Sequence, residues 1–385
     1  MNKTQELPID FINMLHDLLG DEASDLIMAL EKEPQTSVRL NKRKPGAEFP
    51  EATPVNWCES GFYLKDRPEF IFDPLLHAGA YYVQDASSMI YETVVSKLIK
   101  IFNSQDSTVN SYFRVLDLCA SPGGKTTAMI NALPDESTVV ANEYSPKRVG
   151  ALSETLAKWG FPNVDITNKD SSFFARQGEN FDIVAVDAPC SGEGMMRKEE
   201  MARQQWTLKL VEQCSELQKE ILQNAIQALK PGGFLIYSTC TFNRSENEEN
   251  AEFIMHELGL EPINLNFPKE WDIPGGINTH LPVYRFMPHK TKGEGLFLCV
   301  FRKSGKWEQS KKTFRIKNTN PDYPTVEVDK NTALSYLRRE SIILPSDTPK
   351  GFVTITYKGL PLGPAKNIGS RANNLYPKNW RILKR

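Results

Sequence analysis

The segment YSTCTFNRSENEEN, residues 237–250, places a cysteine, Cys240, where an apolar run stops and a series of Ser, Asn and Glu begins. The apolar run predicts a strand, and the polar series predicts the start of a helix. A nearby helix N-terminus favours the thiolate, which is the nucleophilic form of cysteine. Most free cysteines are small buried apolar residues, so core packing is the competing interpretation. The segment makes Cys240 a candidate for covalent catalysis.

Acidic side chains occupy the same position at the ends of four other predicted strands: Asp117, Glu143, Asp170 and Asp187. The strands are FRVLDLCA, STVVANEY, VDITNKD and FDIVAVDAPC, and GGFLIYSTC ends at Cys240. In parallel α/β sheets, ligands bind at the carboxyl ends of the strands. Each acid alone could be a surface residue or a helix cap. Together on one edge, they predict a functional site.

Helices are predicted between these strands, which favours a parallel α/β sheet with right-handed crossovers. SPGGKTTAMINAL and SPKRVGALSETLAKWG are two of them, and a long helix is expected from about 202 to 229, stopped by Pro-Gly-Gly. SENEENAEFIMHEL predicts a further helix, and GEGLFLCVFRK predicts a last strand.

The turn LDLCASPGGKTT joins a strand to a helix through Gly123 and Gly124. Backbone amides at the helix start would face a ligand, and glycine allows close approach. A phosphate loop of the GxxxxGK[ST] type is excluded, because its first glycine would fall at Cys119. Glu143, about twenty residues past the glycines, stands where an acid holds ribose hydroxyls in nucleotide-binding folds.

Two smaller units flank the sheet. Residues 1–83 predict an α+β domain with helices at 8–19 and 22–32, a strand in TSVRLNKRK and a basic cluster at 42–44. The linker is expected at 304–320, and residues 321–385 predict a small β-rich domain. Residues 304–385 carry 16 Lys and Arg against 6 Asp and Glu, a net charge of +10 on a chain whose total is −2. This segment could bind a polyanion or be a solvated basic tail.

Several protein classes are excluded by composition. No run of eighteen apolar residues or secretory signal occurs, so a cytoplasmic protein with no membrane partner is expected. The six cysteines form no CxxC pair and no zinc-binding spacing, so neither a disulfide frame nor a metal site is expected.

Three segments in this order, LCASPGGKTT, DAPCSGEGMMRK and YSTCTFNRSENE, resemble the signature motifs of the Sun/nucleolar-protein-2 (RsmB/NOP) family of RNA cytosine-5 methyltransferases. The resemblance covers residues 84–303. GLPLG followed by NLYPK resembles the bacterial 16S rRNA methyltransferase F subgroup, with its C-terminal PUA-like domain. The implied fold is a Rossmann-like class I methyltransferase sheet between an N-terminal α+β RNA-binding-type domain and the PUA-like domain.

The resemblance implies that S-adenosyl-L-methionine binds at the glycine turn and the acids. The residues expected there are Cys119, Ala120, Ser121, Pro122, Gly123, Gly124, Lys125, Glu143, Arg148, Asp170 and Asp187. Many members carry Ala-Pro-Gly where this chain has Ser-Pro-Gly-Gly, a departure with no expected consequence. Asp170 is expected to receive an adenine amino group.

The resemblance also implies the reaction. Addition of a thiolate to carbon 6 of cytosine makes carbon 5 nucleophilic toward a sulfonium methyl group. Cys240 is implied to be the nucleophile and Cys190 to act in product release. In DNA enzymes a Pro-Cys pair supplies the nucleophile, so Cys190 is the rival by position. Asp187 is expected to contact the cytosine. Lys125 is expected to reach the pyrimidine or the acid, or else to be a solvated lysine.

The target base must be unpaired or flipped out of its helix. Arg197 and Lys198, after Cys190, are expected to contact its phosphates, and the basic cluster at 42–44 could add a contact. Lys358, Arg371, Lys378 and Arg381, with aromatics including Tyr376 and Trp380, are expected to bind RNA. The expected substrate is 16S ribosomal RNA, free or in a subunit, and the expected state is a monomer. The alternatives are the same chemistry on tRNA, or a catalytically silent RNA-binding ribosome-assembly factor. Methylation of a protein or small molecule would leave the basic domain and the two thiols unexplained.

Overall fold

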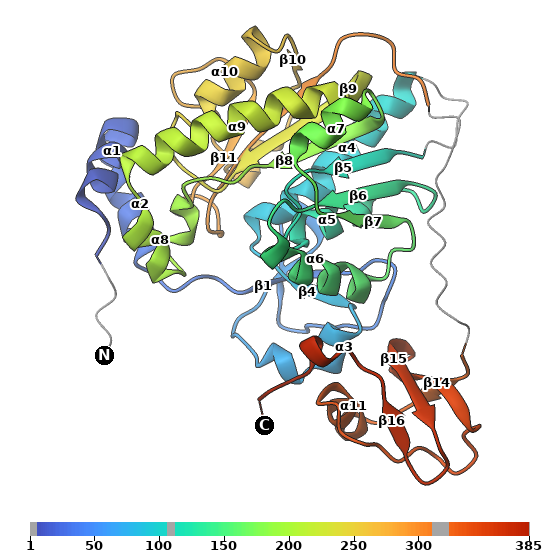
Figure 1. Ribbon diagram of the computed structural model, residues 1–385. Helices are drawn as coiled ribbons and strands as arrows, with labels where there is room; N and C mark the ends of the chain where they lie inside the picture. The colour runs from blue at the N-terminus through green and yellow to red at the C-terminus, as the bar shows by residue number, and fades with distance from the viewer. Residues whose placement is uncertain (1–5, 106–111, 310–322, 385) are drawn as a thin grey trace.

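The computed structural model describes residues 6–105, 112–309 and 323–384, which form three sheets with their helices (Figure 1). Within these residues the central sheet has eight strands, in the order β10-β12-β9-β8-β5-β6-β7, with β11 paired to β12. Their bounds are β5 (Arg114–Asp117), β6 (Thr138–Asn142), β7 (Val164–Thr167), β8 (Phe181–Asp187), β9 (Leu229–Thr239), β10 (Glu261–Pro262), β11 (Val283–Phe286) and β12 (Leu296–Arg302). Strands β7, β6, β5, β8 and β9 are mutually parallel, and β12 pairs antiparallel to β9.

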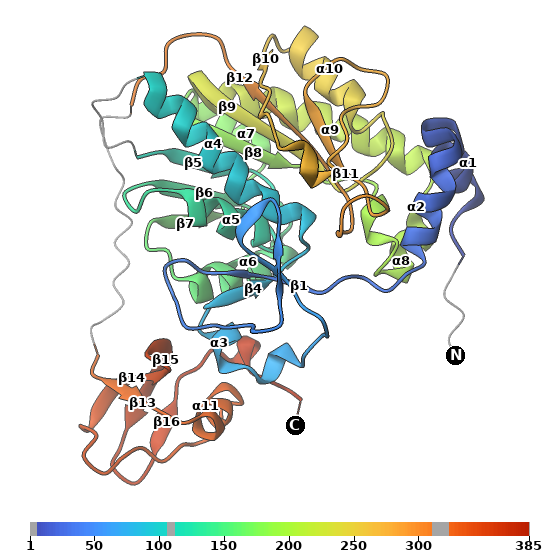
Figure 2. The same cartoon turned by 180° about the vertical axis from the view of Figure 1, so that it is seen from behind.

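Helices cover both faces of this sheet, as the two opposite views show (Figures 1 and 2). One face packs against α4 (Ile90–Gln105), α5 (Gly124–Ala132) and α6 (Pro146–Trp159). The other packs against α7 (Ser171–Gln177), α9 (Leu208–Ala228) and α10 (Glu248–His256). Successive strand residues face opposite sides, so Val115 joins the first core and Leu116 the second. The predicted Rossmann-like α/β sheet is confirmed.

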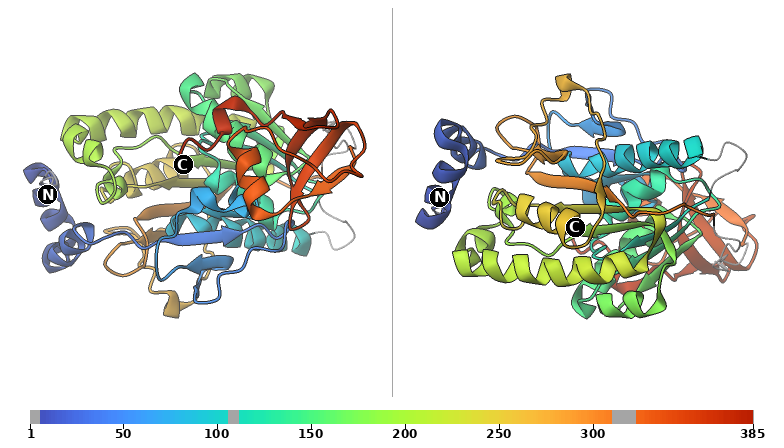
Figure 3. Two further views of the ribbon diagram at one scale, coloured as in Figure 1. Left: turned by 90° about the horizontal axis from the view of Figure 1, so that it is seen from below. Right: turned by 90° about the horizontal axis from the view of Figure 1, so that it is seen from above.

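The N-terminal segment forms two parts. Helices α1 (Ile9–Leu19) and α2 (Ala23–Leu30) lie beside α8 (Glu200–Gln205) and the start of α9, sharing a core with Trp206 and Phe242 (Figure 3). The following sheet has the order β2-β3-β1-β4. Its bounds are β1 (Ser37–Leu40), β2 (Thr53–Val55), β3 (Cys58–Tyr63) and β4 (Tyr81–Val83), with α3 (Pro74–His77) before β4.

The cations of the cluster at 42–44 have partners within the protein, but Lys42 stays exposed, so the RNA contact considered from the sequence remains a prediction. Lys42 pairs with Glu59 and Glu92, each at 2.8 Å. The Arg43 guanidinium donates to two carbonyl groups at the end of α5, and Lys44 Nζ donates to two carbonyls. These cations connect the N-terminal sheet to the central domain because backbone carbonyls at helix ends lack intrahelical partners.

The C-terminal unit contains β13 (Thr325–Glu327), α11 (Lys330–Leu337), β14 (Gly351–Tyr357), β15 (Leu360–Asn367) and β16 (Ala372–Asn374). The sheet order is β13-β14-β15-β16, so the region is β-rich as expected. Its core includes Ala78 of the N-terminal segment, which links the two units. Tyr376 is 1% exposed in this core, so it cannot stack on a base as the sequence suggested. The expected linker lies largely outside the described residues.

Local structure also departs from expectation in the long helix and in elements that the sequence did not predict. The helix predicted from about 202 is broken at Trp206, because the buried indole holds an extended backbone and Thr207 caps a new helix by accepting from Leu210 N. Strand β11 was not predicted. Among the described residues, no helix is both long enough and apolar enough to cross a membrane.

Candidate active site

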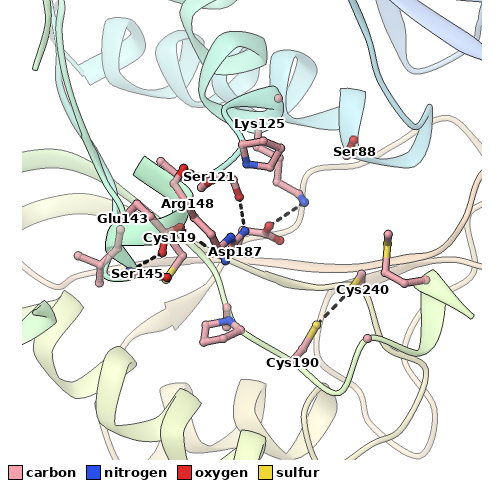
Figure 4. A pocket seen from close by; sticks show the side chains of 18 of the residues that line it. Ser88, Cys119, Ser121, Lys125, Glu143, Ser145, Arg148, Asp187, Cys190 and Cys240 are labelled. Atoms are coloured by element: carbon pink, nitrogen blue, oxygen red, sulfur yellow. Dashed lines mark hydrogen bonds and ion pairs between the residues drawn. The ribbon is translucent and has the colours of Figure 1, made fainter. Parts of the chain in front are cut away.

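A cavity of about 1080 Å³ opens at the carboxyl ends of β5, β6, β8 and β9. Most of the residues predicted for the cofactor and the chemistry line it, as does the segment that follows β4 (Figure 4). Asp117 does not line it. That carboxyl is 1% exposed, accepts from Thr126 Oγ1 at 2.5 Å, and has its pKa raised to about 7 by burial.

The glycine turn after β5 forms one wall. Cys119, Ala120, Ser121, Pro122, Gly124 and Lys125 line the cavity. Gly123 of this turn packs against α6 instead of lining the cavity. Its φ is 106°, and a Cβ there would lie 2.9 Å from Thr155 Cγ2 of α6. The positive φ and the close packing both require glycine at 123. Burial of the Cys119 thiol raises its pKa, which favours a packing role.

Glu143 follows β6 and carries a buried oxygen without a hydrogen-bond partner. Its Oε1 accepts from Ser145 N at 2.8 Å, whereas Oε2 has no hydrogen bond and lies 3.5 Å from Arg148 Nη1. Arg148 Nη2 also donates to Ser121 O at 2.6 Å, which connects α6 to the glycine turn. An unsatisfied buried acceptor beside a glycine turn fits a ligand that brings hydroxyl donors, as a ribose does.

Asp170 lies at the edge of the cavity and caps α7. Its Oδ1 accepts from Ser172 N at 3.0 Å and from Ser172 Oγ at 2.6 Å, and these bonds lower the pKa of this exposed carboxyl. The helix-cap interpretation is therefore realised at this residue. Both cap hydrogen bonds go to Oδ1, so the expected adenine contact would have to use Asp170 Oδ2.

Lys125 and Asp187 form an ion pair in the cavity. Lys125 Nζ donates to Asp187 Oδ2 at 2.8 Å, and Ser238 Oγ donates to Asp187 Oδ1 at 2.7 Å. Burial disfavours the ammonium ion, but the carboxylate outweighs burial and raises the pKa of Lys125. Of the two sequence interpretations of Lys125, a solvated lysine is excluded, and contact with the acid is observed.

Cys190 and Cys240 lie together at one side of the cavity, with their sulfur atoms 3.2 Å apart (Figure 4). Cys190 lies three residues past the end of β8, and Cys240 directly follows β9. The contact with Cys240 and burial together raise the pKa of Cys190 well above the usual value. Either thiol can donate to the other across this contact.

The residues expected to bind RNA differ in accessibility. Arg197 donates to the carbonyl oxygens of Lys32, Glu33 and Gly293, and its side chain is 9% exposed, so protein groups occupy its guanidinium. Lys198 lines the cavity 3.3 Å from Glu294. The four C-terminal candidates, Lys358, Arg371, Lys378 and Arg381, are exposed.

The sequence interpretation missed part of the lining. Tyr82, Gln84, Asp85 and Ser88 lie on or just after β4 and enter the cavity, and Glu294 enters it just before β12. Both Glu294 carboxyl oxygens are buried without a hydrogen bond, and burial raises the pKa. The polar run QDASS, between a strand and a helix, was a signal that could have indicated the first group.

A mixed sheet with five parallel strands in this order, a glycine turn after β5 and an acid after β6 has the architecture of a Rossmann-like methyltransferase. The family model for 16S rRNA methyltransferase RsmB/F matches residues 106–302. Models for the N-terminal domain of 16S rRNA methyltransferase RsmF and for the methyltransferase RsmF PUA domain match residues 7–86 and 323–382. The chain belongs to the 16S rRNA methyltransferase RsmB/F family.

Curated relatives named ribosomal RNA small subunit methyltransferase F agree with this assignment. The Photobacterium profundum protein is 30% identical over 90% of this chain and 74% of its own length. The Cronobacter sakazakii protein is 27% identical over 97% and 96%. The match spans 63% of the Pectobacterium atrosepticum relative, at 32% identity over 78% of this chain.

Two solved structures from Pyrococcus horikoshii share the fold. A methyltransferase homolog protein superposes with a TM-score of 0.63 at 24% identity, covering 76% of this chain and 94% of its own. NSun6, determined with SFG, superposes with a TM-score of 0.64 at 20% identity, covering 78% and 99%.

Proposed function

We propose that this protein transfers a methyl group from S-adenosyl-L-methionine to carbon 5 of a cytosine in 16S ribosomal RNA, through a covalent adduct between Cys240 and carbon 6. The observation that carries the proposal is the contact of two thiols, 3.2 Å apart, in the cavity that also holds the Lys125–Asp187 pair. Membership of the RsmB/F family supports the substrate class. The expected location remains the cytoplasm.

The cavity fits the methyl donor. The glycine turn allows close approach of a ligand, and Glu143 Oε2, which has no hydrogen bond, can accept from a ribose hydroxyl. Cys119 to Lys125, Glu143, Arg148 and Asp170 would form this side of the cavity. S-adenosyl-L-methionine, when bound, supplies an electrophilic methyl group on a sulfonium.

The chain's own residues act on the base. The Cys240 thiolate adds to carbon 6, which breaks the aromatic conjugation and gives carbon 5 enamine character. Asp187 hydrogen-bonds the nitrogen 3 edge of the cytosine and shares a proton with it as the ring takes up negative charge, and Lys125 orients Asp187. After methyl transfer a proton acceptor removes the carbon 5 proton, the carbon 5–carbon 6 double bond forms again, and the carbon 6–sulfur bond breaks to release the Cys240 thiolate.

Cys190 assists the last step. Its sulfur lies 3.2 Å from that of Cys240, so a protonated Cys190 can donate to the departing Cys240 sulfur. A hydrogen bond to the developing thiolate stabilises the leaving group. The contact fits either thiol as the nucleophile, and the resemblance to the RNA enzymes is what favours Cys240, with Cys190 in product release, over the Pro-Cys alternative.

The test uses labelled S-adenosyl-L-methionine and RNA from cells lacking the gene, both as naked RNA and as small ribosomal subunits. Wild type, Cys240→Ala and Cys190→Ala are compared for 5-methylcytosine and for denaturation-resistant protein–RNA adducts. We expect methylation by wild type, no adduct with Cys240→Ala and accumulated adduct with Cys190→Ala. The buried Cys299→Ala serves as a thiol control that should methylate, since this residue lies in the core.

Each contrary outcome points to one alternative. Methylation by Cys240→Ala, or an adduct that depends on Cys190, would reverse the assignment of the thiols. Transfer to tRNA but not to 16S rRNA would move the substrate to tRNA. RNA binding by wild type without transfer to any fraction would favour a silent assembly factor.

A further inference from the structure

Each of the two cysteine loops carries a fully buried glutamate. Glu193 lies three residues after Cys190, and Glu246 lies six residues after Cys240. Both residues are 0% exposed. Burying a carboxylate is costly unless its oxygens are hydrogen-bonded, so the partners of these two acids indicate what they hold in place.

Glu193 reaches across to the backbone of the Cys240 loop. Its Oε2 accepts from Phe242 N at 2.5 Å and from Asn243 N at 3.0 Å. Its Oε1 accepts from Trp206 Nε1 at 3.1 Å, which fixes the carboxylate from the other side. The acid of the first loop therefore holds the two amides that lie two and three residues after Cys240.

Glu246 reaches in the opposite direction. Its Oε2 accepts from Ser191 N, the amide directly after Cys190, at 3.0 Å. The same oxygen accepts from Gln218 Nε2 of α9 at 2.7 Å, and Gln218 Nε2 also donates to Pro189 O. The acid of the second loop thus holds the backbone next to Cys190.

Two further contacts complete the arrangement. Asn243 Nδ2 donates to Glu193 Oε1 at 2.7 Å and to Glu246 Oε1 at 2.8 Å, so one amide connects both acids. Gly194 N donates to Cys240 O at 2.7 Å. A Cβ at Gly194 would lie 2.7 Å from that carbonyl oxygen, so the loops pack without space for a side chain.

We propose that Glu193 and Glu246 are positioning residues that form a reciprocal clamp, each binding the backbone beside the cysteine of the opposite loop and so holding the two sulfur atoms in contact. The roles of the two thiols rest on the proposed function, but the clamp itself concerns only geometry. Burial raises the pKa of both acids, whereas the N–H donors favour the ionised form that accepts them.

The clamp can be tested without catalysis. In buffers of reduced and oxidised glutathione, one oxidised glutathione converts the two thiols to a disulfide and releases two reduced glutathiones. The fraction of Cys190–Cys240 disulfide, read by peptide mass spectrometry, gives the effective concentration of one thiol at the other. The variants are Glu193→Gln and Glu246→Gln. Both oxygens of each wild-type carboxylate accept hydrogen bonds, so the NH₂ group of a glutamine would have to face an N–H donor, and that contact would be lost.

The control is Glu92→Gln. Glu92 is also buried and accepts from Ser60 Oγ and Asn131 Nδ2, far from both cysteine loops in sequence. It corrects for the general cost of altering a buried acid. We expect Glu193→Gln and Glu246→Gln to lower the effective concentration by about tenfold or more, because loss of alignment lowers effective molarity steeply. Glu92→Gln should keep the wild-type value.

Activity supplies the second measurement. Both clamp variants should lower kcat by roughly 10- to 100-fold while KM for RNA and for S-adenosyl-L-methionine stays near wild type, since no ligand contact is removed. Wild-type effective concentration in both variants would overturn the clamp. If either variant fails to fold, Asn243→Ala, which removes the amide between the acids, must show the same reduction for the proposal to stand. If the variants lower the effective concentration but the wild-type protein methylates no RNA, the clamp stands and the proposed function is rejected.

Discussion

The ammonium group of Lys125, in the first turn of α5, lies 2.8 Å from the carboxylate of Asp187 at the end of β8. The pair brings together the glycine turn and the Asp187–Cys190 segment, which are far apart in the chain. Both side chains line the cavity, and Figure 4 shows the pair between the group around Glu143 and the two thiols.

Lys125→Met should remove the partner of Asp187 and leave a carboxylate unpaired. We expect kcat to fall by roughly 10²- to 10³-fold, the usual decrease when a group that aligns transition-state charge is removed. Lys209→Ala, which removes an exposed lysine of α9, is the charge control and should keep wild-type kinetics. Methyl transfer at the wild-type rate by Lys125→Met would reject a role for the pair in the reaction.

Glu143→Gln should weaken binding of the methyl donor. Oε2, which has no hydrogen bond, is the proposed acceptor for ribose hydroxyls, and a hydrogen bond to a charged group contributes about 1.5–3 kcal/mol. Titration calorimetry with S-adenosyl-L-homocysteine should therefore show an affinity about 10- to 100-fold lower. Glu154→Gln, which alters an acid paired with Lys158 within α6, should bind as wild type does. Unchanged affinity in Glu143→Gln would place the ribose elsewhere.

Asp117→Asn should change how stability depends on pH. Burial raises the pKa of Asp117 from an ordinary value of 3.8 to about 7, so between these values the folded state binds a proton that the unfolded state has released. The stability linked to this proton is fully present below about pH 4. As pH rises toward 7, the free energy of unfolding falls by a few kcal/mol at most. Urea unfolding at about pH 4.5 and pH 7 should show this decrease in wild type and a smaller one in Asp117→Asn. Equal slopes in the two proteins would mean that Asp117 is ionised across this range.

Neutralising the exposed C-terminal cations should weaken RNA binding without unfolding the protein. A variant with alanine at Lys358, Arg371, Lys378 and Arg381 should bind RNA more weakly and with a shallower salt dependence. The log–log slope should fall by about 0.7 for each phosphate that no longer meets a cation. The melting temperature should stay near wild type, because these side chains are exposed. An unchanged salt slope would place the RNA on another surface.

Arg197→Ala should behave in the opposite way. Its guanidinium donates to three backbone carbonyls that connect the segment after α2 to the loop before β12, so its removal should lower the melting temperature. We expect the salt dependence of RNA binding to stay as in wild type. A lower salt slope with an unchanged melting temperature would instead make Arg197 an RNA contact.

The sequence by itself determined the sheet and the edge at which the site lies. Alternating strands and helices require parallel strands, and parallel strands place their carboxyl ends together, so Glu143, Asp187 and Cys240 could be assigned to one edge from the sequence. The order of the three motifs indicated the family for the same reason. Strand ends, turns and motifs are each formed by residues close together in the chain, so they can be identified from the sequence.

Tertiary structure alone decided what each charged side chain contacts. Arg197, Arg43 and Lys44 resemble RNA contacts in sequence but donate to backbone carbonyls of the protein itself. Glu193 and Glu246 resemble residues of polar surface loops but are buried against the opposite loop. A hydrogen bond or ion pair between distant segments depends on which groups lose water together on folding, and a single sequence does not specify that partner.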